Sequence, residues 1–196
     1  MGEFDLLPGD RVGAPGIAVC GDRRAHALEL VGRGLHARPG NVRVGVAAEK
    51  ERGRSTERAG VAAMALGLIE ECLKLSVQYA KDRLLWERPI SEFQLIQLKL
   101  ARMEIARLNV ENLVFRHIEM SAAGRSLTLA EASAMKLYSA QAASEVAMDA
   151  VQLFGGNGYM AEFRVEQLAR DAKVFQIYAG TDEIQVTHIA RDLLSR

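Results

Sequence analysis

The chain has 196 residues, of which 49% are hydrophobic, and 25 lysines and arginines balance 25 aspartates and glutamates. This length is enough to bury a sizeable core in one domain or slightly more. The balanced charge gives no reason to expect nucleic acid or an anionic membrane surface as a partner, so any anionic ligand must be held by local groups.

The cysteines and the apolar runs indicate the compartment. Cys20 and Cys72 fit neither a disulfide framework nor metal-ligand spacing, and His117 and His188 have no partner spaced for a metal or a nucleophile. The first residues lack the layout of a secretory signal, and no run approaches the ~18 apolar residues that a membrane span needs. We therefore expect a cytoplasmic protein with free thiols, no metal site and no membrane span.

Residues 1–54 differ in composition from the rest of the chain. Ten of the 17 glycines and three of the four prolines lie there, with no sustained period of 2 or 3.6. A short strand over residues 42–48 is the one regular element that they suggest. A flexible arm, a poorly packed extension and the product of a misread upstream coding segment all stay open. We treat residues 1–54 as an irregular, possibly disordered arm and residues 55–196 as the folded domain.

From Ser55 onward the apolar pattern is helical. Apolar side chains recur at steps of three and four residues over residues 61–79, which predicts a helix with a wide buried face. Pro89 disfavours helical conformation at Arg88, so the pattern predicts a break over residues 82–89.

Two capping boxes predict where the next helices begin. An S-x-x-Q box opens at Ser91, with Ile90 before it as a hydrophobic staple, and this helix should end near residue 123. A T-x-x-E box opens at Thr128 and begins an alanine-rich helix that should end at Phe154. The first of these helices would be roughly 45 Å long at ~1.5 Å per residue, a length typical of helical bundles.

Residues 151–185 hold two glycine-bearing turns. The cluster at residues 155–158, Gly-Gly-Asn-Gly, can end one helix and bring backbone N–H groups close to an anion or a cofactor. A short helix over residues 165–176 leads to a second turn, after which Thr181 is a good N-cap for a helix over residues 182–194. The two turns can therefore face a single ligand. About five helices in all predict an all-α, up-and-down bundle.

Four groups of residues, in this order along the chain, are characteristic. They are Glu57-Arg58; Asp82-Arg83 with Pro89-Ile90 and Phe93-Gln94; Gln152 with Gly155-Gly156-Asn157-Gly158-Tyr159; and Arg170-Asp171 with Gly180-Thr181. From residue 57 to the end, the chain resembles the C-terminal helical domain of acyl-CoA dehydrogenases. These oxidoreductases of fatty acid metabolism are flavoproteins that form the α,β double bond of acyl-CoA thioesters.

The resemblance implies that the domain contacts FAD through two segments, with the cofactor bound by a neighbouring subunit. The residues concerned are Arg83, Trp86 and Gln94 in one segment, and Gln152, Gly155, Gly156 and Gly158 in the other. A guanidinium and close glycine N–H groups suit a diphosphate. Thr181 and Glu183 match positions on the flavin side. Where the family typically has Phe-Gly, this chain has Trp86-Glu87, which adds bulk and negative charge near the predicted diphosphate.

The base that removes the substrate's α-proton is implied to lie outside its commonest position. Many members carry a glutamate directly before the Gly-Thr pair, where this chain has Ala179. A minority, including isovaleryl-CoA and long-chain-type enzymes, carries the base at the position of Glu57, which is therefore the candidate base. The Ala179 backbone N–H would hydrogen-bond the thioester carbonyl. The remaining residues implied to bind the acyl-CoA substrate are Arg58, Tyr178 and Gly180.

Family members are longer, with an N-terminal helical domain and a middle β-domain that residues 1–54 do not show. The first interpretation is therefore an acyl-CoA dehydrogenase C-terminal domain that is incomplete and weakly active or inactive alone. The alternatives are a non-catalytic helical oligomerisation or interaction module and a related flavin oxidase or monooxygenase. The resemblance also implies a homodimer or homotetramer and, if the chain is active, an electron-accepting flavoprotein as partner.

Overall fold

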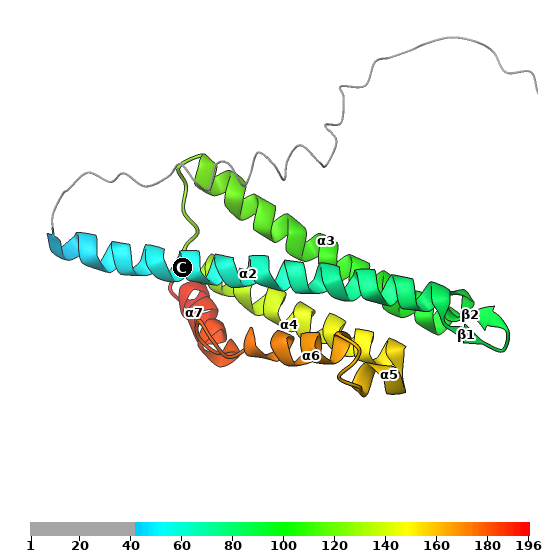
Figure 1. The fold of residues 1–196 in the computed structure, drawn as a ribbon. Helices are drawn as coiled ribbons and strands as arrows, with labels where there is room; N and C mark the ends of the chain where they lie inside the picture. Colours follow the sequence, from blue (N-terminus) through cyan, green and yellow to red (C-terminus); the bar gives the residue numbers. More distant parts are fainter. Residues whose placement is uncertain (1–41) are drawn as a thin grey trace, which may run out of the picture. The chain divides into compact units, whose positions relative to one another are not determined.

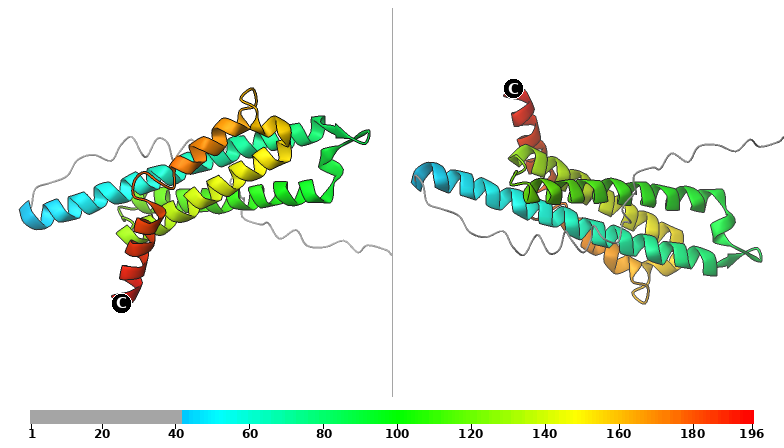
Figure 2. Two further views of the ribbon diagram at one scale, coloured as in Figure 1. Left: turned by 90° about the horizontal axis from the view of Figure 1, so that it is seen from below. Right: turned by 90° about the horizontal axis from the view of Figure 1, so that it is seen from above.

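The structure is a computed structural model that describes residues 42–196, with side chains described from residue 53 onward. Five longer helices form a bundle in this part of the chain (Figure 1). They are α2 (Val42–Asp82), α3 (Gln94–Ala122), α4 (Leu129–Phe154), α6 (Val165–Val174) and α7 (Asp182–Leu194). Helix α4 packs against all four others, and α2 lies along α3, α4 and α6 (Figure 2). The predicted all-α bundle is confirmed.

Helix α4 is central because its small side chains allow close approach. Its fully buried alanines are Ala132, Ala140, Ala143, Ala147 and Ala150. Across from them, α2 buries Val61, Ile69 and Cys72. Near the far end of both helices, the Tyr79 ring stacks on Phe154 with centroids 4.0 Å apart. Stacked aromatic pairs contribute stability beyond that of the apolar area that they bury, so this pair fixes the end of α4 against the end of α2.

Short elements interrupt the helices where the sequence predicts breaks. After α2, strands β1 (Leu84–Leu85) and β2 (Arg88–Pro89) form an antiparallel hairpin, followed by the 3-10 turn η1 (Ile90–Glu92). Helix α5 (Gly156–Tyr159) is a single turn after α4. The hairpin turn has both central residues in the left-handed region, with φ of 51° at Trp86 and 64° at Glu87.

The strand predicted over residues 42–48 is wrong, because these residues form the first turns of α2. The alternating valines there suggested period 2, but good helix formers follow over residues 47–52. Extending an existing helix adds one hydrogen bond per residue, so α2 continues backward through the valines. The boundary at residue 54 stays a prediction. Residues 1–41, including Cys20, lie outside the described residues.

The capping box at Thr128 is confirmed, since Glu131 N–H donates to Thr128 Oγ1 at 3.1 Å and Thr128 N–H donates to Glu131 Oε2 at 2.9 Å. The box at Ser91 is wrong. Pro89 leads into η1, which takes up Ser91, so α3 begins only at Gln94 and its N-cap makes no side-chain bond. Among the described helices, none is long and apolar enough to cross a membrane.

Candidate active site

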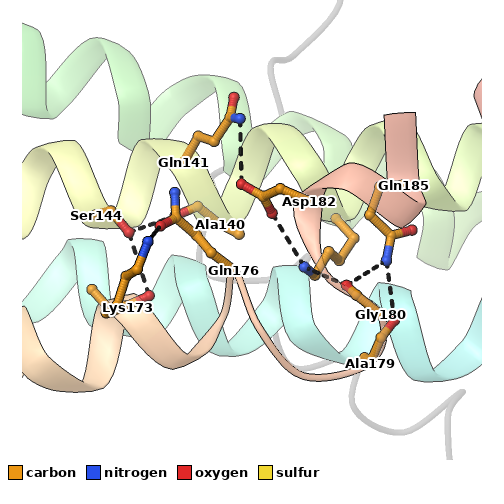
Figure 3. A network of polar contacts seen from close by, with 11 residues as sticks. Ala140, Gln141, Ser144, Lys173, Gln176, Ala179, Gly180, Asp182 and Gln185 are labelled. Atoms are coloured by element: carbon orange, nitrogen blue, oxygen red, sulfur yellow. Dashed lines mark hydrogen bonds and ion pairs between the residues drawn. The ribbon is translucent and has the colours of Figure 1, made fainter. Parts of the chain in front are cut away.

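The turn between α6 and α7 has a strained backbone. Ala179 has a φ of 53° and Gly180 a φ of 92°. For alanine, the left-handed region costs roughly 1–2 kcal/mol, so neighbouring groups must hold it there. Gln185 does so: its Nε2 donates to the Ala179 carbonyl at 3.0 Å and to the Gly180 carbonyl at 2.7 Å (Figure 3). A Cβ on Gly180 would lie 2.8 Å from Gln185 Nε2, so this position needs glycine.

A buried ammonium group lies against the same turn. Lys136 of α4 is fully buried, and its Nζ donates to the Gly180 carbonyl at 2.9 Å and lies 3.4 Å from Asp182 Oδ1. Asp182 also accepts a 3.4 Å bond from Gln141 Nε2 (Figure 3). Burial lowers the pKa of Lys136, whereas Asp182 raises it. A buried charge is costly unless it is paired, and here the carbonyl and the carboxylate are its partners.

The Ala179 N–H, in contrast, donates no hydrogen bond within residues 42–196. Both carbonyls of the turn are bound by side chains, while this N–H is left for another acceptor. A backbone donor held in one direction by a rigid turn is the arrangement that stabilises a developing oxyanion. The predicted role of Ala179 needs a backbone N–H that is available to a ligand, and no acceptor among the described residues occupies this one.

Glu57 and Arg58, on the first half of α2, lie beside this turn. Glu57 is exposed. The pKa of Tyr178 is raised, first by the burial of Tyr178 itself and then by the charge of Glu57. The Tyr178 hydroxyl lies 3.8 Å from Met64 Sδ, one to two turns further along α2. A Cβ on Gly180 would lie 3.8 Å from Arg58 Nη2. The structure thus brings the candidate base together with the turn that holds Ala179, although more than 100 residues separate them.

Arg58 has buried hydrogen-bond donors that no described residue binds. Its side chain is 4% exposed, and its Nε and Nη1 have no hydrogen-bond partner among the described residues. Burial and the charge of Arg54 lower the pKa of Arg58, while Glu57 raises it. An unpaired buried donor is rare in proteins and points to an acceptor that the described residues do not supply. Arg58 is therefore suited to bind an oxygen of a ligand or cofactor.

Two further predicted residues meet at the start of α7. Thr181 occupies the N-cap position, as predicted, but its side chain makes no capping bond. Its hydroxyl instead hydrogen-bonds Glu183, which lowers the pKa of that carboxyl group. Glu183 is exposed, so this pair stays accessible at the end of the helix.

The glycine turn of residues 155–158 lies near the other end of α2. Asn157 Nδ2 donates to the Tyr79 hydroxyl at 2.9 Å. Gly155 needs glycine because its φ is 60°, and a Cβ on Gly158 would lie 2.3 Å from the Val151 carbonyl. Gly156 has neither constraint, and a Cβ there would meet nothing within 4 Å. The turn is therefore fixed by Gly155 and Gly158, with open space beside Gly156.

The hairpin beyond α2 carries the other predicted cofactor contacts on its surface. Arg83, Gln94 and, in the last turn of α4, Gln152 are exposed, and Trp86 is 78% exposed. The Trp86 ring meets only the edge of Phe93, with centroids 5.8 Å apart. Gly155 N–H donates to the Gln152 carbonyl at 3.2 Å and Gly158 N–H to the Gly155 carbonyl at 2.9 Å, so these two amides are occupied. The exposed guanidinium of Arg83 suits a diphosphate, and the exposed face of Trp86 suits a planar ring. The donor set thus fits FAD.

The two groups of residues are not brought together within the chain. One group meets α2 at Met64 and the other at Tyr79. These positions are about 22 Å apart at 1.5 Å per helical residue. A single ligand that both glycine-bearing turns face must therefore be extended, and that the turns share one ligand stays a prediction.

Sequence reasoning missed Lys136 and Gln185. The signal for Lys136 was a charged residue within the buried stripe of α4, where Ser133, Ser139 and Ala140 surround it at helical spacing. Gln185 carried no comparable signal, because a glutamine four residues after an N-cap usually faces water. Among the described residues, no group of three His, Cys, Asp or Glu side chains could hold a metal ion.

Comparison with known proteins identifies the family. The family model for the C-terminal domain of acyl-CoA dehydrogenase matches residues 48–194. An acyl-CoA dehydrogenase of Bacillus subtilis (strain 168) is 41% identical over 170 residues, which are 87% of this chain and 41% of that protein. The mitochondrial isovaleryl-CoA dehydrogenase of Oryza sativa subsp. japonica is 38% identical over 141 residues, 72% of this chain and 34% of that protein.

Among solved structures, butyryl-CoA dehydrogenase from Megasphaera elsdenii matches with a TM-score of 0.69 and 38% identity, covering 72% of this chain and 37% of that one. The chain thus spans about two fifths of the length of these relatives or less. The matched part is the helical bundle described above. The chain belongs to the acyl-CoA dehydrogenase family, and residues 48–194 form its C-terminal domain.

Proposed function

We propose that this chain supplies the base and the oxyanion donor for the FAD-dependent α,β-dehydrogenation of an acyl-CoA thioester. The observation that carries this proposal is the position of Glu57 beside a rigid turn whose Ala179 N–H donates no hydrogen bond to the described residues. A base on one side of the α-carbon and a donor to the carbonyl oxygen are the two groups that proton removal next to a thioester requires.

The chain's own residues would act as follows. A Glu57 carboxylate oxygen takes the proton from the α-carbon, and negative charge moves to the thioester oxygen. The Ala179 N–H donates to that oxygen as the charge develops. Arg58 offers Nε and Nη1 to a further oxygen at the same site. FAD, when bound, would supply the acceptor for the hydride that leaves the β-carbon. Because Glu57 is exposed here, a cover from outside the described residues is needed to exclude water from the base.

We assign the two groups of predicted cofactor contacts to the FAD molecules of two subunits. Thr181 and Glu183 of one chain would face the flavin end of its own FAD. The residues that reach the neighbour's FAD would be Arg83, Trp86, Gln94, Gln152, Gly155, Gly156 and Gly158. The separation of about 22 Å between the groups supports this division, since each group can then contact a different FAD. This assignment requires at least two copies of the chain, so the protein would be a homodimer or a homotetramer.

An electron-accepting flavoprotein would reoxidise the bound flavin, and the acyl-CoA would be the reductant. A cytoplasmic location stays a prediction.

The proposal puts the substrate-binding residues Arg58, Tyr178 and Gly180 at the carbonyl end of the site, so they do not indicate acyl chain length or branching.

The first experiment is to purify the 196-residue chain, measure flavin absorbance, and assay acyl-CoA-dependent reduction of an electron acceptor. We expect a folded helical protein with little or no turnover, because the chain spans about two fifths or less of its relatives. Stoichiometric FAD with turnover would contradict that expectation. Turnover with nitroalkanes, or turnover that consumes oxygen, would instead favour a related flavin oxidase or monooxygenase.

A second candidate function is a helical oligomerisation module. It is favoured by apolar side chains exposed on α3 and α4, namely Leu95, Leu98, Ile105, Leu108, Tyr138 and Met148. Single exposed apolar side chains are normal on a protein surface, whereas several on neighbouring helices suit packing against another helical protein surface. A flavin-free, folded oligomer that gains no activity in any reconstitution would support this candidate over the enzyme.

A further inference from the structure

We propose that Lys136 and Gln185 are positioning residues, which hold the turn of residues 178–181 so that the Ala179 N–H stays aimed at a ligand carbonyl. This inference deepens the proposed function and rests on it for the identity of the ligand. The positioning itself is a property of the chain, and it can be measured without flavin or substrate.

The first argument is that two helices bind the same atom. The Gly180 carbonyl oxygen accepts from Lys136 Nζ at 2.9 Å and from Gln185 Nε2 at 2.7 Å. Lys136 comes from α4 and Gln185 from α7, so the turn is fixed to two separate elements of the bundle. Gln185 Nε2 also binds the Ala179 carbonyl at 3.0 Å, directly beyond the strained residue.

The second argument is that Ala179 keeps an unfavourable conformation. Its φ of 53° suits glycine, yet the side chain is alanine and the backbone does not relax. Backbone strain persists where surrounding contacts over-determine it, and such sites are frequently functional. Binding both carbonyls of the turn removes the rotations by which Ala179 could return to negative φ.

The third argument is that folding alone does not explain the buried ammonium group. Lys136 is fully buried, and burial is the largest influence on its lowered pKa. Replacing a buried charge by an apolar side chain of similar size is often neutral or stabilising. Gln185 is a similar case, since its buried Oε1 has no hydrogen-bond partner among the described residues. Both side chains therefore serve the geometry of the turn more than the stability of the bundle.

The test uses the full chain and NMR spectroscopy. The three-bond couplings from the N–H proton of Ala179 to its Hα and Cβ atoms, taken together as the Ala179 coupling, report its φ including the sign. Hydrogen exchange of the same amide reports how often the turn opens. Lys136→Met keeps the length of the side chain and removes the donor. Lys74→Met is the matched control, because Lys74 is 76% exposed and contacts neither carbonyl. Gln185→Leu removes the other donor.

We expect Lys136→Met and Gln185→Leu each to move the Ala179 coupling toward that of negative φ. Exchange of this amide should rise roughly tenfold or more, while the slowest-exchanging core amides of α4 stay within about threefold of wild type. Lys74→Met should change neither. A role confined to folding predicts instead that turn and core amides accelerate together and that the coupling is unchanged, which would overturn the inference.

If Lys136→Met does not fold, Gln185→Leu decides alone: an unchanged Ala179 coupling in that variant also overturns the inference. Failure of the proposed enzyme function would show only in the flavin and turnover measurements. The two ideas can therefore fail separately.

Discussion

Lys136 Nζ, in the second turn of α4, donates a hydrogen bond to the carbonyl of Gly180, which lies 44 residues further along the chain. This bond joins the most buried helix of the bundle to the turn that carries Ala179. Glu57 on α2 lies near the same turn, because its charge contributes to the raised pKa of Tyr178, so three distant segments lie close together where the family's chemistry is expected.

A methyl group should destabilise the fold at both residues of the turn, so removing one and adding one should have opposite effects. Ala179→Gly removes strain at φ 53° and should raise the free energy of unfolding by up to about 1 kcal/mol, even after glycine's greater entropy in the unfolded chain. Gly180→Ala should lower it, because φ is 92° and the new Cβ would lie 2.8 Å from Gln185 Nε2. Urea denaturation measures both. Equal effects of the two substitutions would contradict the described turn.

The hairpin turn should be stabilised by glycine. Glu87 has a φ of 64°, so Glu87→Gly should raise the free energy of unfolding by about 0.5–1 kcal/mol. Glu92→Gly is the control, because Glu92 lies in η1 outside the positive-φ residues and should lose stability. The family typically has glycine at position 87, and the left-handed backbone gives a physical reason for it. A loss of stability in Glu87→Gly would show that the turn is misplaced.

The two helix starts predicted as capping boxes should differ on mutation. Thr128→Ala removes a cap hydrogen bond of 3.1 Å and should cost about 1 kcal/mol of unfolding free energy. Ser91→Ala should cost much less, because Ser91 lies in η1 and caps nothing. Thermal denaturation of both variants decides between the two predicted boxes. If Ser91→Ala lowered the free energy of unfolding as much as Thr128→Ala, Ser91 would be a helix cap after all, contrary to the structure.

Stability should fall as the pH drops from about 6.5 toward 5. Burial lowers the pKa of His117, and burial is also the largest cause of the lowered pKa of His188. The unfolded chain therefore binds protons at these residues first, and the stability contribution, full above pH ~6.5, is lost as the pH falls toward the lower folded pKa. The charged residues that line the same pocket as His117 are Arg116 and Glu131.

The double variant His117→Gln/His188→Gln should flatten this pH dependence, as measured by urea unfolding at pH 7 and pH 5. Carboxylates with lowered pKa, such as Glu104, act only below about pH 4.5 and do not interfere. An unchanged slope in the double variant would assign the acid sensitivity to other groups.

The sequence predicted the long helices well, because their apolar periods and the box at Thr128 are local signals. It failed at Ser91, where the 3-10 turn after Pro89 displaced the helix start, and at residues 42–48, where helix extension overrode alternating valines. These failures arise where a neighbouring element decides the local structure.

The candidate site was predictable only in part. The resemblance named Glu57 and Ala179, and the structure places both at one turn. It could not show that Lys136 and Gln185 hold that turn, because contacts across 44 residues leave no pattern in a single sequence. Nor could it show that the glycine turn lies about 22 Å away along α2.

The most direct test of the central claim is the Glu57→Gln substitution in a complete enzyme. Residues 48–194 of this chain would replace the matching domain of a full-length acyl-CoA dehydrogenase, so that any base on this domain comes from this sequence. We expect Glu57→Gln to lower kcat by about 100-fold or more with FAD content unchanged, and Ala179→Glu to restore part of it. Glu119→Gln, at an exposed position on α3, is the control. Turnover of Glu57→Gln within about threefold of the unmutated enzyme would contradict the account, since loss of a catalytic base removes far more.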